Sequence, residues 1–339
     1  MKSLVFRGPW DLVIEDRPIR EPQPGEALIR VHATGICGSD LHGYTGATGR
    51  RHPGQVMGHE TVGHVAQLGS GTTGVAEGAL VTVNPMLSCG DCSFCRSGHE
   101  SACTSLRVIG VHPEPDAAFA EYLTVPVVSL VPLAPQMPAD HGALVEPLAV
   151  GYHAVGRGEM TPADRVLVLG GGPIGQATAL AARRLGAGDV CVSEPSARRR
   201  DLLATLGFVT TTPDAVGVAA AEILSGPPTL VFDAVGASGT LTTALTVAAP
   251  LARIVLIGMA EPDLTVPSYA ISTRERSIIG TFGYSSADFR ASAVWAAEAP
   301  EDLDALIERT EPLTAGPEIF RALADHSLDA HKILLSPAG

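Results

Sequence analysis

The chain has 339 residues, enough for two domains that each bury a core. Hydrophobic residues make up 45% and charged residues 17%, a composition typical of folded globular proteins. The net charge of −13 repels nucleic-acid phosphates and anionic lipids, so we expect neither nucleic acid nor a membrane as a partner.

The first residues, MKSLVFRGPW, lack the apolar segment of a signal peptide. The sequence also has no apolar run of about 18 residues, the length needed to span a bilayer. We therefore expect a cytoplasmic protein. In that compartment six cysteines point to metal binding or catalysis rather than to disulfides.

Short alternating apolar runs, separated by glycine and proline, dominate the first 145 residues and predict a β domain. These runs cover residues 2–8, 11–19, 26–34, 79–85 and 120–126.

From residue 146 to 284 apolar strands alternate with helices, which predicts a doubly wound parallel sheet. An alanine-rich helix is expected over 174–185, ended by Gly186. The remaining residues, 285–339, predict helices over 288–299 and 301–310 and a last strand over 332–336. The six expected strands of the parallel sheet are 165–170, 190–194, 208–211, 229–233, 253–258 and 277–282.

The segment RVLVLGGGPIGQATAL joins a strand, a glycine-rich turn and a helix. Gly170, Gly172 and Gly175 fit the G-x-G-x-x-G pattern, and Pro173 and Ile174 open the helix between them. In this pattern the glycines allow a tight turn, a close approach of the pyrophosphate and close helix packing. We therefore predict dinucleotide binding; the alternative is a purely structural turn.

The following strand ends in Glu194, 19 residues after Gly175, where an acid can accept a hydrogen bond from a ribose 2′-hydroxyl. Arg198, Arg199 and Arg200 come next and can bind a 2′-phosphate, or form the exposed face of a helix. Because Glu194 repels a 2′-phosphate, we favour NAD over NADP and count Arg199 among the cofactor contacts.

Cys89, Cys92, Cys95 and Cys103 lie within 15 residues of one another in a polar loop. Four thiolates suit a closed tetrahedral zinc, which is a structural site. Free thiols, an iron–sulfur cluster and a nucleic-acid-binding zinc ribbon are the alternatives. The acidic charge and the absence of a basic cluster argue against the ribbon.

Cys37, His59 and Glu60 offer a thiolate, an imidazole and a carboxylate. Three protein ligands and one open position form the pattern of a catalytic zinc. Each residue also has a structural interpretation, because a cysteine or a histidine can simply belong to the core. Spacing alone leaves this site undecided.

Together these segments resemble the zinc-containing medium-chain alcohol and polyol dehydrogenases, a group that includes sorbitol, threonine and 2,3-butanediol dehydrogenases. The markers occur in order along the chain: GICGSDLH, GHE, the four-cysteine loop, FAEY, VEPLAV, GGGPIG and SEP. The resemblance implies an α/β fold, with a GroES-like β-barrel catalytic domain over 1–145, completed by 285–339. A Rossmann NAD-binding domain over 146–284 is inserted between these two parts.

The resemblance assigns roles residue by residue. Cys37 and His59 match catalytic zinc ligands, and Glu60 matches an acid that ligates zinc directly in some relatives. Glu146 matches the position that binds zinc or holds its water. A third ligand cysteine has no counterpart here, which places the chain nearer the polyol branch.

Ser39 and His42 match the proton-relay positions, and Asp40 matches an acid that supports the site. Two positions depart from sorbitol dehydrogenases: Gly283 stands in the place of an arginine, and Gly43 in that of a tyrosine. Both departures remove hydrogen-bond donors from the substrate side. The expected pocket residues are Tyr44 and Tyr284.

The sequence therefore predicts an oxidoreductase with two zinc ions per chain and NAD, acting on a secondary alcohol. We expect a small alcohol or vicinal diol rather than a long open-chain polyol; a cyclitol, aminocyclitol or sugar alcohol is the alternative. A zinc-free reductase of the same superfamily and a catalytically silent binding protein are the competing interpretations. The resemblance also implies a homodimer or homotetramer.

Overall fold

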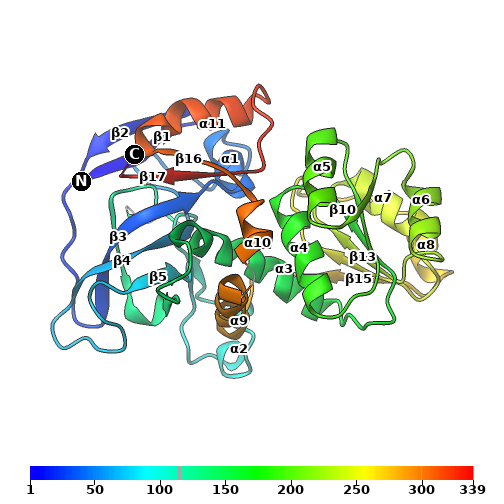
Figure 1. Cartoon of the computed structure of the whole chain (residues 1–339), viewed down its shortest axis with the longest axis horizontal. Coiled ribbons are helices and arrows are strands. Elements are labelled where there is room, and N and C mark those ends of the chain that lie inside the picture. The colour runs from blue at the N-terminus through cyan, green and yellow to red at the C-terminus, as the bar shows by residue number, and fades with distance from the viewer. Residues whose placement is uncertain (114–115, 299, 339) are drawn as a thin grey trace. The chain divides into compact units, whose positions relative to one another are not determined.

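A computed structural model describes residues 1–113, 116–298 and 300–338 (Figure 1). The chain divides into two compact units. The first contains residues 1–146 and 285–339, and the second contains residues 147–284. The first unit is thus built from both ends of the chain, and each unit is described by itself below.

The centre of the first unit is a seven-stranded sheet with the order β16-β17-β3-β4-β5-β9, in which β8 also pairs with β3. Most of its pairings are antiparallel, and most residues of its central strand β3 are buried. The strands are β3 (Glu26–Gly35), β4 (Glu60–Leu68), β5 (Leu80–Val83), β8 (Tyr122–Pro126), β9 (Leu130–Pro132), β16 (Ile307–Pro312) and β17 (Lys332–Ser336).

Smaller elements cover this sheet (Figure 1). A hairpin of β1 and β2 packs near the C-terminal helix α11, and two short strands, β6 and β7, pair on either side of the cysteine loop. Their bounds are β1 (Lys2–Gly8), β2 (Asp11–Asp16), α1 (Gly38–Tyr44), β6 (Met86–Leu87), β7 (Arg107–Val108), η2 (Val127–Ser129), η3 (Ala139–Leu144), α9 (Ser286–Glu298), α10 (Pro300–Asp304), η4 (Leu313–Ala315) and α11 (Gly316–Ala324).

The second unit is a parallel sheet with the order β12-β11-β10-β13-β14-β15. The strand order reverses at β10, as it does in dinucleotide-binding folds. All six expected strands are present, and this confirms the predicted doubly wound sheet. They are β10 (Val166–Leu169), β11 (Val190–Ser193), β12 (Val209–Thr211), β13 (Leu230–Asp233), β14 (Arg253–Leu256) and β15 (Ser277–Gly280).

Helices connect these parallel strands, as crossover connections require. The expected helix over 174–185 is confirmed as α4, which begins one residue earlier, at Pro173. The helices are α3 (Val145–Arg157), α4 (Pro173–Arg184), α5 (Ala197–Thr205), α6 (Val216–Ile223), α7 (Ser238–Val247) and α8 (Ser268–Ser272).

One helix prediction is wrong in its second half. Residues 301–310 were expected to form one helix, but α10 ends at Asp304 and strand β16 begins at Ile307. Strand β16 pairs in parallel with β17, so a partner about 25 residues further along the chain decides its conformation. The other helix predicted in this part, 288–299, is present as α9, and its last residue lies outside the described residues.

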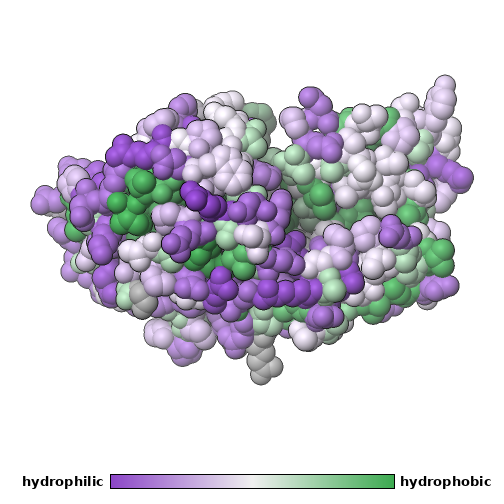
Figure 2. All heavy atoms as spheres, turned by 90° about the horizontal axis from the view of Figure 1, so that it is seen from above, coloured by the Kyte–Doolittle hydropathy of each residue, from purple (hydrophilic) through white to green (hydrophobic). Residues whose placement is uncertain are grey.

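The surface shown in Figure 2 is mostly hydrophilic, with apolar side chains in small separate patches. Among the described residues, no helix has both the length and the hydrophobicity needed to cross a bilayer.

Asp164 links two parts of the second unit. One carboxylate oxygen accepts hydrogen bonds from the Thr229 hydroxyl at 2.7 Å and from the Arg253 guanidinium, and the other accepts from the Thr161 N–H at 2.8 Å. Burial alone raises the pKa of Asp164, but the hydrogen bonds, above all the one from Arg253, outweigh it and hold this pKa below its ordinary value of 3.8.

We expect Asp164→Asn to lower the free energy of unfolding at pH 7 by about 1–3 kcal/mol, because charged hydrogen bonds are lost. A lowered pKa contributes stability above the unfolded-state pKa and loses it as the pH falls through the folded-state value. The difference from the parent protein should therefore shrink below about pH 4 in urea titrations. The exposed Asp189, changed to Asn, is the control; a pH-independent difference at Asp164 would contradict this account.

Candidate functional site

The glycine-rich turn of the second unit leaves open space where a cofactor phosphate would lie. Gly170, at the end of β10, has φ of 94°, in the region that favours glycine. A side chain at Gly175 would place its Cβ 1.8 Å from the Gly170 carbonyl oxygen, so helix α4 packs directly on the turn. At Gly172 the nearest atom to such a Cβ is Arg199 Nη1, 3.8 Å away. Pro173 then begins α4, whose N-terminus attracts anions.

Glu194 follows β11 and holds this turn. It is buried, and its two carboxylate oxygens accept hydrogen bonds from the N–H groups of Gly171 at 2.6 Å and Ser196 at 2.8 Å. Ser196 caps helix α5 by accepting from the N–H of Arg199 at 3.4 Å. The expected cofactor residues therefore surround the glycine-rich turn. Each carboxylate oxygen of Glu194 still has a lone pair that can accept a hydrogen bond from a ribose hydroxyl.

The four loop cysteines come together in the first unit. Their sulfur atoms all lie within 4.8 Å of one another. Helix α2 (Ser93–Arg96) and the turn η1 (Glu100–Ala102) bring them together. Three backbone N–H groups of this loop donate to thiol sulfurs, at 3.4–3.5 Å.

The four thiols differ in how readily they ionise. The N–H of Cys95 lowers the pKa of Cys92 to about 7, whereas Asp91 raises that of Cys89 to about 12. Four adjacent thiols cannot all ionise unless a positive charge stands between them. The donor set and its N–H···S bonds therefore fit a structural zinc.

Helix α1 places Cys37 at the second candidate site. Cys37 is the N-cap residue of this helix, and its N–H donates to Asp40 Oδ2 at 3.1 Å, as in a capping box. Asp40 is fully buried. The cap therefore fixes the thiol and a buried carboxylate in one turn of the chain.

Cys37, His59 and Glu60 meet, and one donor atom from each lies within 4.8 Å of the others. His59 Nδ1 lies 3.5 Å from Asp40 Oδ1, and neither of these buried atoms has another hydrogen-bond partner among the described residues. With Nδ1 turned to a carboxylate, Nε2 is the nitrogen left for a metal.

The electrostatics of this site favour positive charge. Burial alone lowers the pKa of His59, but the Asp40 carboxylate and the Cys37 thiol raise it well above its ordinary value. The thiol, the imidazole and the carboxylate of this site are donor types that zinc takes in proteins. The residues present therefore fit a zinc ion.

Arg51 is a buried residue of this region that the sequence interpretation missed. Its guanidinium lies 3.8 Å from Asp40, donates to the Val111 carbonyl at 2.9 Å and approaches the Ser39 carbonyl at 3.5 Å. A Cβ at Gly43 would lie 2.7 Å from Arg51 Cγ. Because Gly43 has no side chain, the Arg51 side chain has room to pass beside it.

Tyr44, one of the two expected pocket residues, lies in the core of the first unit, and its role at a substrate stays a prediction. Tyr44 is 1% exposed, its ring packs against Phe320 and Trp10, and its hydroxyl donates to the Trp10 carbonyl at 3.1 Å. Tyr284, in the other unit, is buried as well, and its role at a substrate stays a prediction. Gly283 has φ of 56°, so its backbone itself favours glycine.

The remaining predicted residues lie in the first unit. Ser39 is half-buried and His42 exposed, three residues apart on α1. Glu146 is buried in the first turn of α3, outside the Cys37, His59 and Glu60 set. Lys332, which the sequence interpretation also missed, donates to both oxygens of Glu60.

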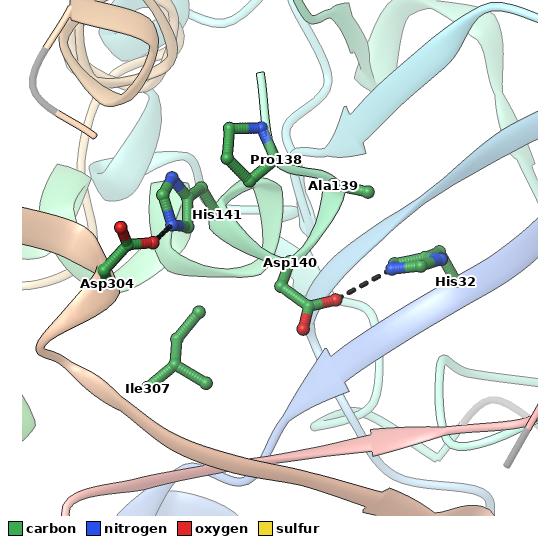
Figure 3. Close-up of a pocket in the computed structure, with 7 residues that line it drawn as sticks. All are labelled: His32, Pro138, Ala139, Asp140, His141, Asp304 and Ile307. Carbon is green, nitrogen blue, oxygen red and sulfur yellow. Dashed lines mark hydrogen bonds and ion pairs between the residues drawn. The ribbon is translucent and has the colours of Figure 1, made fainter. Parts of the chain in front are cut away.

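A pocket of about 410 Å³ lies in this unit. Figure 3 shows its lining side chains, among which two histidines each face an acid. His32 lies 2.7 Å from Asp140, and the buried His141 lies 2.7 Å from Asp304. Asp140 and His141 belong to η3, the turn that leads into α3 and Glu146. These pairs anchor that turn to β3 and α10.

Comparison with known proteins identifies the family. The sequence matches the profile "Alcohol dehydrogenase GroES-like domain" over residues 23–135 and the profile "Zinc-binding dehydrogenase" over residues 173–298. It is 31% identical to L-galactonate-5-dehydrogenase of Escherichia coli (strain K12), over 94% of both chains. The chain therefore belongs to the zinc-containing medium-chain alcohol and polyol dehydrogenases, and its first unit contains a GroES-like domain.

Two solved structures resemble this one closely. A zinc-binding dehydrogenase from Sinorhizobium meliloti 1021, bound to NADP, has a TM-score of 0.88 and 30% identity, covering 99% of each chain. The alcohol dehydrogenase rspB from Escherichia coli CFT073, in complex with NADH, has a TM-score of 0.89 and 31% identity, also over 99% of each chain.

Two glycine substitutions should separate cofactor binding from folding. We expect Gly172→Ala to keep its unfolding midpoint but to bind NADH at least about tenfold more weakly, a loss of about 1.4 kcal/mol. Its Cβ meets no protein atom closer than 3.8 Å and instead enters the space for the phosphates. Gly175→Ala should lower the unfolding midpoint, because its Cβ collides with the Gly170 carbonyl. Fluorescence titration and thermal melts measure both; equal NADH affinity in Gly172→Ala and the parent would refute the placement.

Two cysteine substitutions should separate the metal centres. We expect two zinc ions per chain, falling to one in both Cys37→Ser and Cys95→Ser. Cys95→Ser should lower the melting temperature strongly, because a closed zinc site contributes folding free energy. Cys37→Ser should stay folded but lose activity. Elemental analysis and calorimetry measure these effects, with Cys191→Ala, a buried residue of β11, as the control. Two zinc ions in Cys37→Ser would disprove the second centre.

Proposed function

We propose that this chain transfers hydride between a secondary alcohol and NAD, producing a ketone and NADH. The observation that carries the proposal is the set of Cys37, His59 and Glu60 gathered beside the buried Asp40. Membership of the family and the open turn at Gly172 support it. In this proposal residues 1–146 and 285–339 form the catalytic domain, and 147–284 bind the nucleotide.

Cys37 and His59 hold the catalytic zinc, with Glu60 or Glu146 as the acid of the site. When bound, zinc supplies Lewis acidity toward the substrate oxygen, and the nicotinamide accepts or returns the hydride. Asp40 keeps His59 in the tautomer and orientation that a metal ligand needs. The second zinc belongs to the four loop cysteines and stabilises the fold.

The proton of the alcohol leaves through α1. Ser39 is half-buried and His42 is exposed, and residues three apart lie on the same side of a helix. The Ser39 hydroxyl receives the proton at its oxygen while releasing its own, and the His42 ring passes a proton to solvent.

The buried Glu194 supports NAD as the cofactor. Its carboxylate lies against the glycine-rich turn, where it can accept from the 2′-hydroxyl and repels a 2′-phosphate. Arg199, whose Nη1 is the nearest atom to a Cβ at Gly172, is then a contact for the phosphates rather than for a 2′-phosphate.

The substrate in this proposal is a small secondary alcohol or vicinal diol. Gly283 carries no side-chain donor at the position where sorbitol dehydrogenases have an arginine, and the Tyr44 hydroxyl is engaged inside the core of the first unit. Each unpartnered hydroxyl of a long polyol costs about 1–3 kcal/mol in such a pocket. The L-galactonate relative makes oxidation of a sugar acid the second candidate.

We further propose that the protein acts in the cytoplasm, where its six unpaired cysteines stay reduced, and that it assembles as a homodimer or homotetramer. Light scattering of the purified chain measures the assembly.

Rates with NAD and NADP should be compared for 2,3-butanediol, sorbitol, L-galactonate and myo-inositol. We expect the highest kcat/KM with 2,3-butanediol and NAD. A preference for sorbitol of about tenfold, or 1.4 kcal/mol in the transition state, would contradict the pocket proposed here. A preference for NADP would contradict the role of Glu194, and inactivity with every alcohol would favour a catalytically silent protein.

A further inference from the structure

Arg200, the last residue of the arginine run that opens α5, is turned back toward the end of strand β11. Its Nη1 donates to the Glu194 carbonyl at 2.8 Å and to the Pro195 carbonyl at 2.6 Å. An Nη nitrogen of a guanidinium carries two hydrogens, so both hydrogens of this nitrogen have acceptors in the protein. Arg200 therefore binds the backbone of the turn that joins β11 to α5.

This backbone contact is linked to the side chain of Glu194. The Pro195 carbonyl and the Ser196 N–H belong to one planar peptide group and point in opposite directions. Arg200 binds this peptide group at its oxygen, and the N–H of the same group donates to Glu194 Oε1 at 2.8 Å. A cation at the oxygen polarises the peptide group and strengthens its N–H as a donor. A single peptide group thus connects the guanidinium to the Glu194 carboxylate.

The other carboxylate oxygen of Glu194 is fixed by the glycine-rich turn. The N–H of Gly171 donates to Oε2 at 2.6 Å. A Cβ at Gly171 would lie 2.9 Å from Glu194 Cβ and 3.0 Å from its Cγ, so a side chain there would displace the glutamate. The carboxylate is therefore held from two sides, by Gly171 and by the peptide group that Arg200 binds.

We infer that Arg200 is a positioning residue that sets the preference for NAD over NADP by holding the Glu194 carboxylate in place. A carboxylate fixed beside the turn accepts from the 2′-hydroxyl of NAD and repels the 2′-phosphate of NADP. Without Arg200, the peptide group between Pro195 and Ser196 is free to rotate, and the carboxylate turns away from the ribose. The inference rests on the proposed function, in which Glu194 binds the ribose.

This role gives Arg200 an effect opposite to that of a phosphate ligand. An arginine that binds the 2′-phosphate strengthens NADPH binding, so its removal weakens NADPH more than NADH. Removal of Arg200 should instead weaken NADH more, because the acceptor for the hydroxyl and the repulsion of the phosphate are lost together. The sign of the change in preference therefore distinguishes the two roles.

The test measures the affinity of the full chain for NADH and for NADPH by fluorescence titration at one ionic strength. We expect Arg200→Met to raise the ratio of NADPH affinity to NADH affinity at least about fivefold, the lower end of ordinary coupling between sites. Arg200→Lys can still donate to both carbonyls and should keep most of the preference of the parent. The matched control is Arg198→Met, which removes the same charge from an exposed position in the same turn of α5 and should not raise the ratio.

A lower or unchanged ratio in Arg200→Met would overturn the inference. An equal rise in Arg198→Met would do the same, because the effect would then be one of charge alone. If Arg200→Met does not fold, Arg200→Gln, which also removes the charge and shortens the side chain, is measured in its place. Gly171→Ala displaces Glu194 from the other side and should raise the ratio as well; an unchanged ratio there would contradict the role of the fixed carboxylate.

Hydrogen exchange in the cofactor-free chain gives a second readout that needs neither turnover nor NAD. Arg200→Met should speed the exchange of the N–H groups of Gly171 and Ser196, which lose their fixed acceptor, whereas Arg198→Met should not. A parent protein that binds NADPH more tightly than NADH would refute the proposed cofactor, while the exchange rates still decide whether Arg200 holds Glu194. Unchanged exchange at both N–H groups in Arg200→Met would overturn the inference in either case.

Discussion

The carboxylate of Asp40 is fully buried, and a buried charge has to be matched by groups of the protein. Its partners come from three separate segments: the N–H of Cys37, the ring of His59 and the guanidinium of Arg51. All three partners reach Asp40 only if Cys37 caps α1 and His59, just before strand β4, lies beside that helix. This arrangement also requires a glycine at position 43, where the arginine passes.

A second buried carboxylate, that of Glu60, is likewise neutralised by a buried cation, because it forms an ion pair with Lys332. Two acids and two cations thus flank Cys37 and His59. Arg51, from the segment just after α1, faces Asp40, and Lys332, from the last strand, binds Glu60. This arrangement explains why a barrel built from both ends of the sequence is suited to the site.

Elements whose conformation depends on neighbouring residues are predicted correctly from the sequence. Elements and contacts that depend on residues far along the chain are not. The six parallel strands are found because each is a short apolar run, and the glycine turn because its residues are contiguous. Strand β16 is mistaken for a helix because β17 alone makes it a strand. The burial of Tyr44 is not predicted, because the sequence does not say which side of a short helix faces the core. Lys332 is missed because 272 residues separate it from Glu60, although a lysine opening an apolar strand is a detectable signal.

The chain has only two lysines, Lys2 and Lys332, and this scarcity makes the C-terminal strand observable in solution. Reagents that acylate lysine have an exposed target in Lys2, whereas Lys332 is enclosed between β17 and the acid it binds. Acylation of Lys332 requires β17 to separate from β3, and its rate measures how often that edge of the sheet opens. Mass spectrometry of one peptide can therefore follow the local opening of the barrel, with Lys2 as the internal reference for reagent activity.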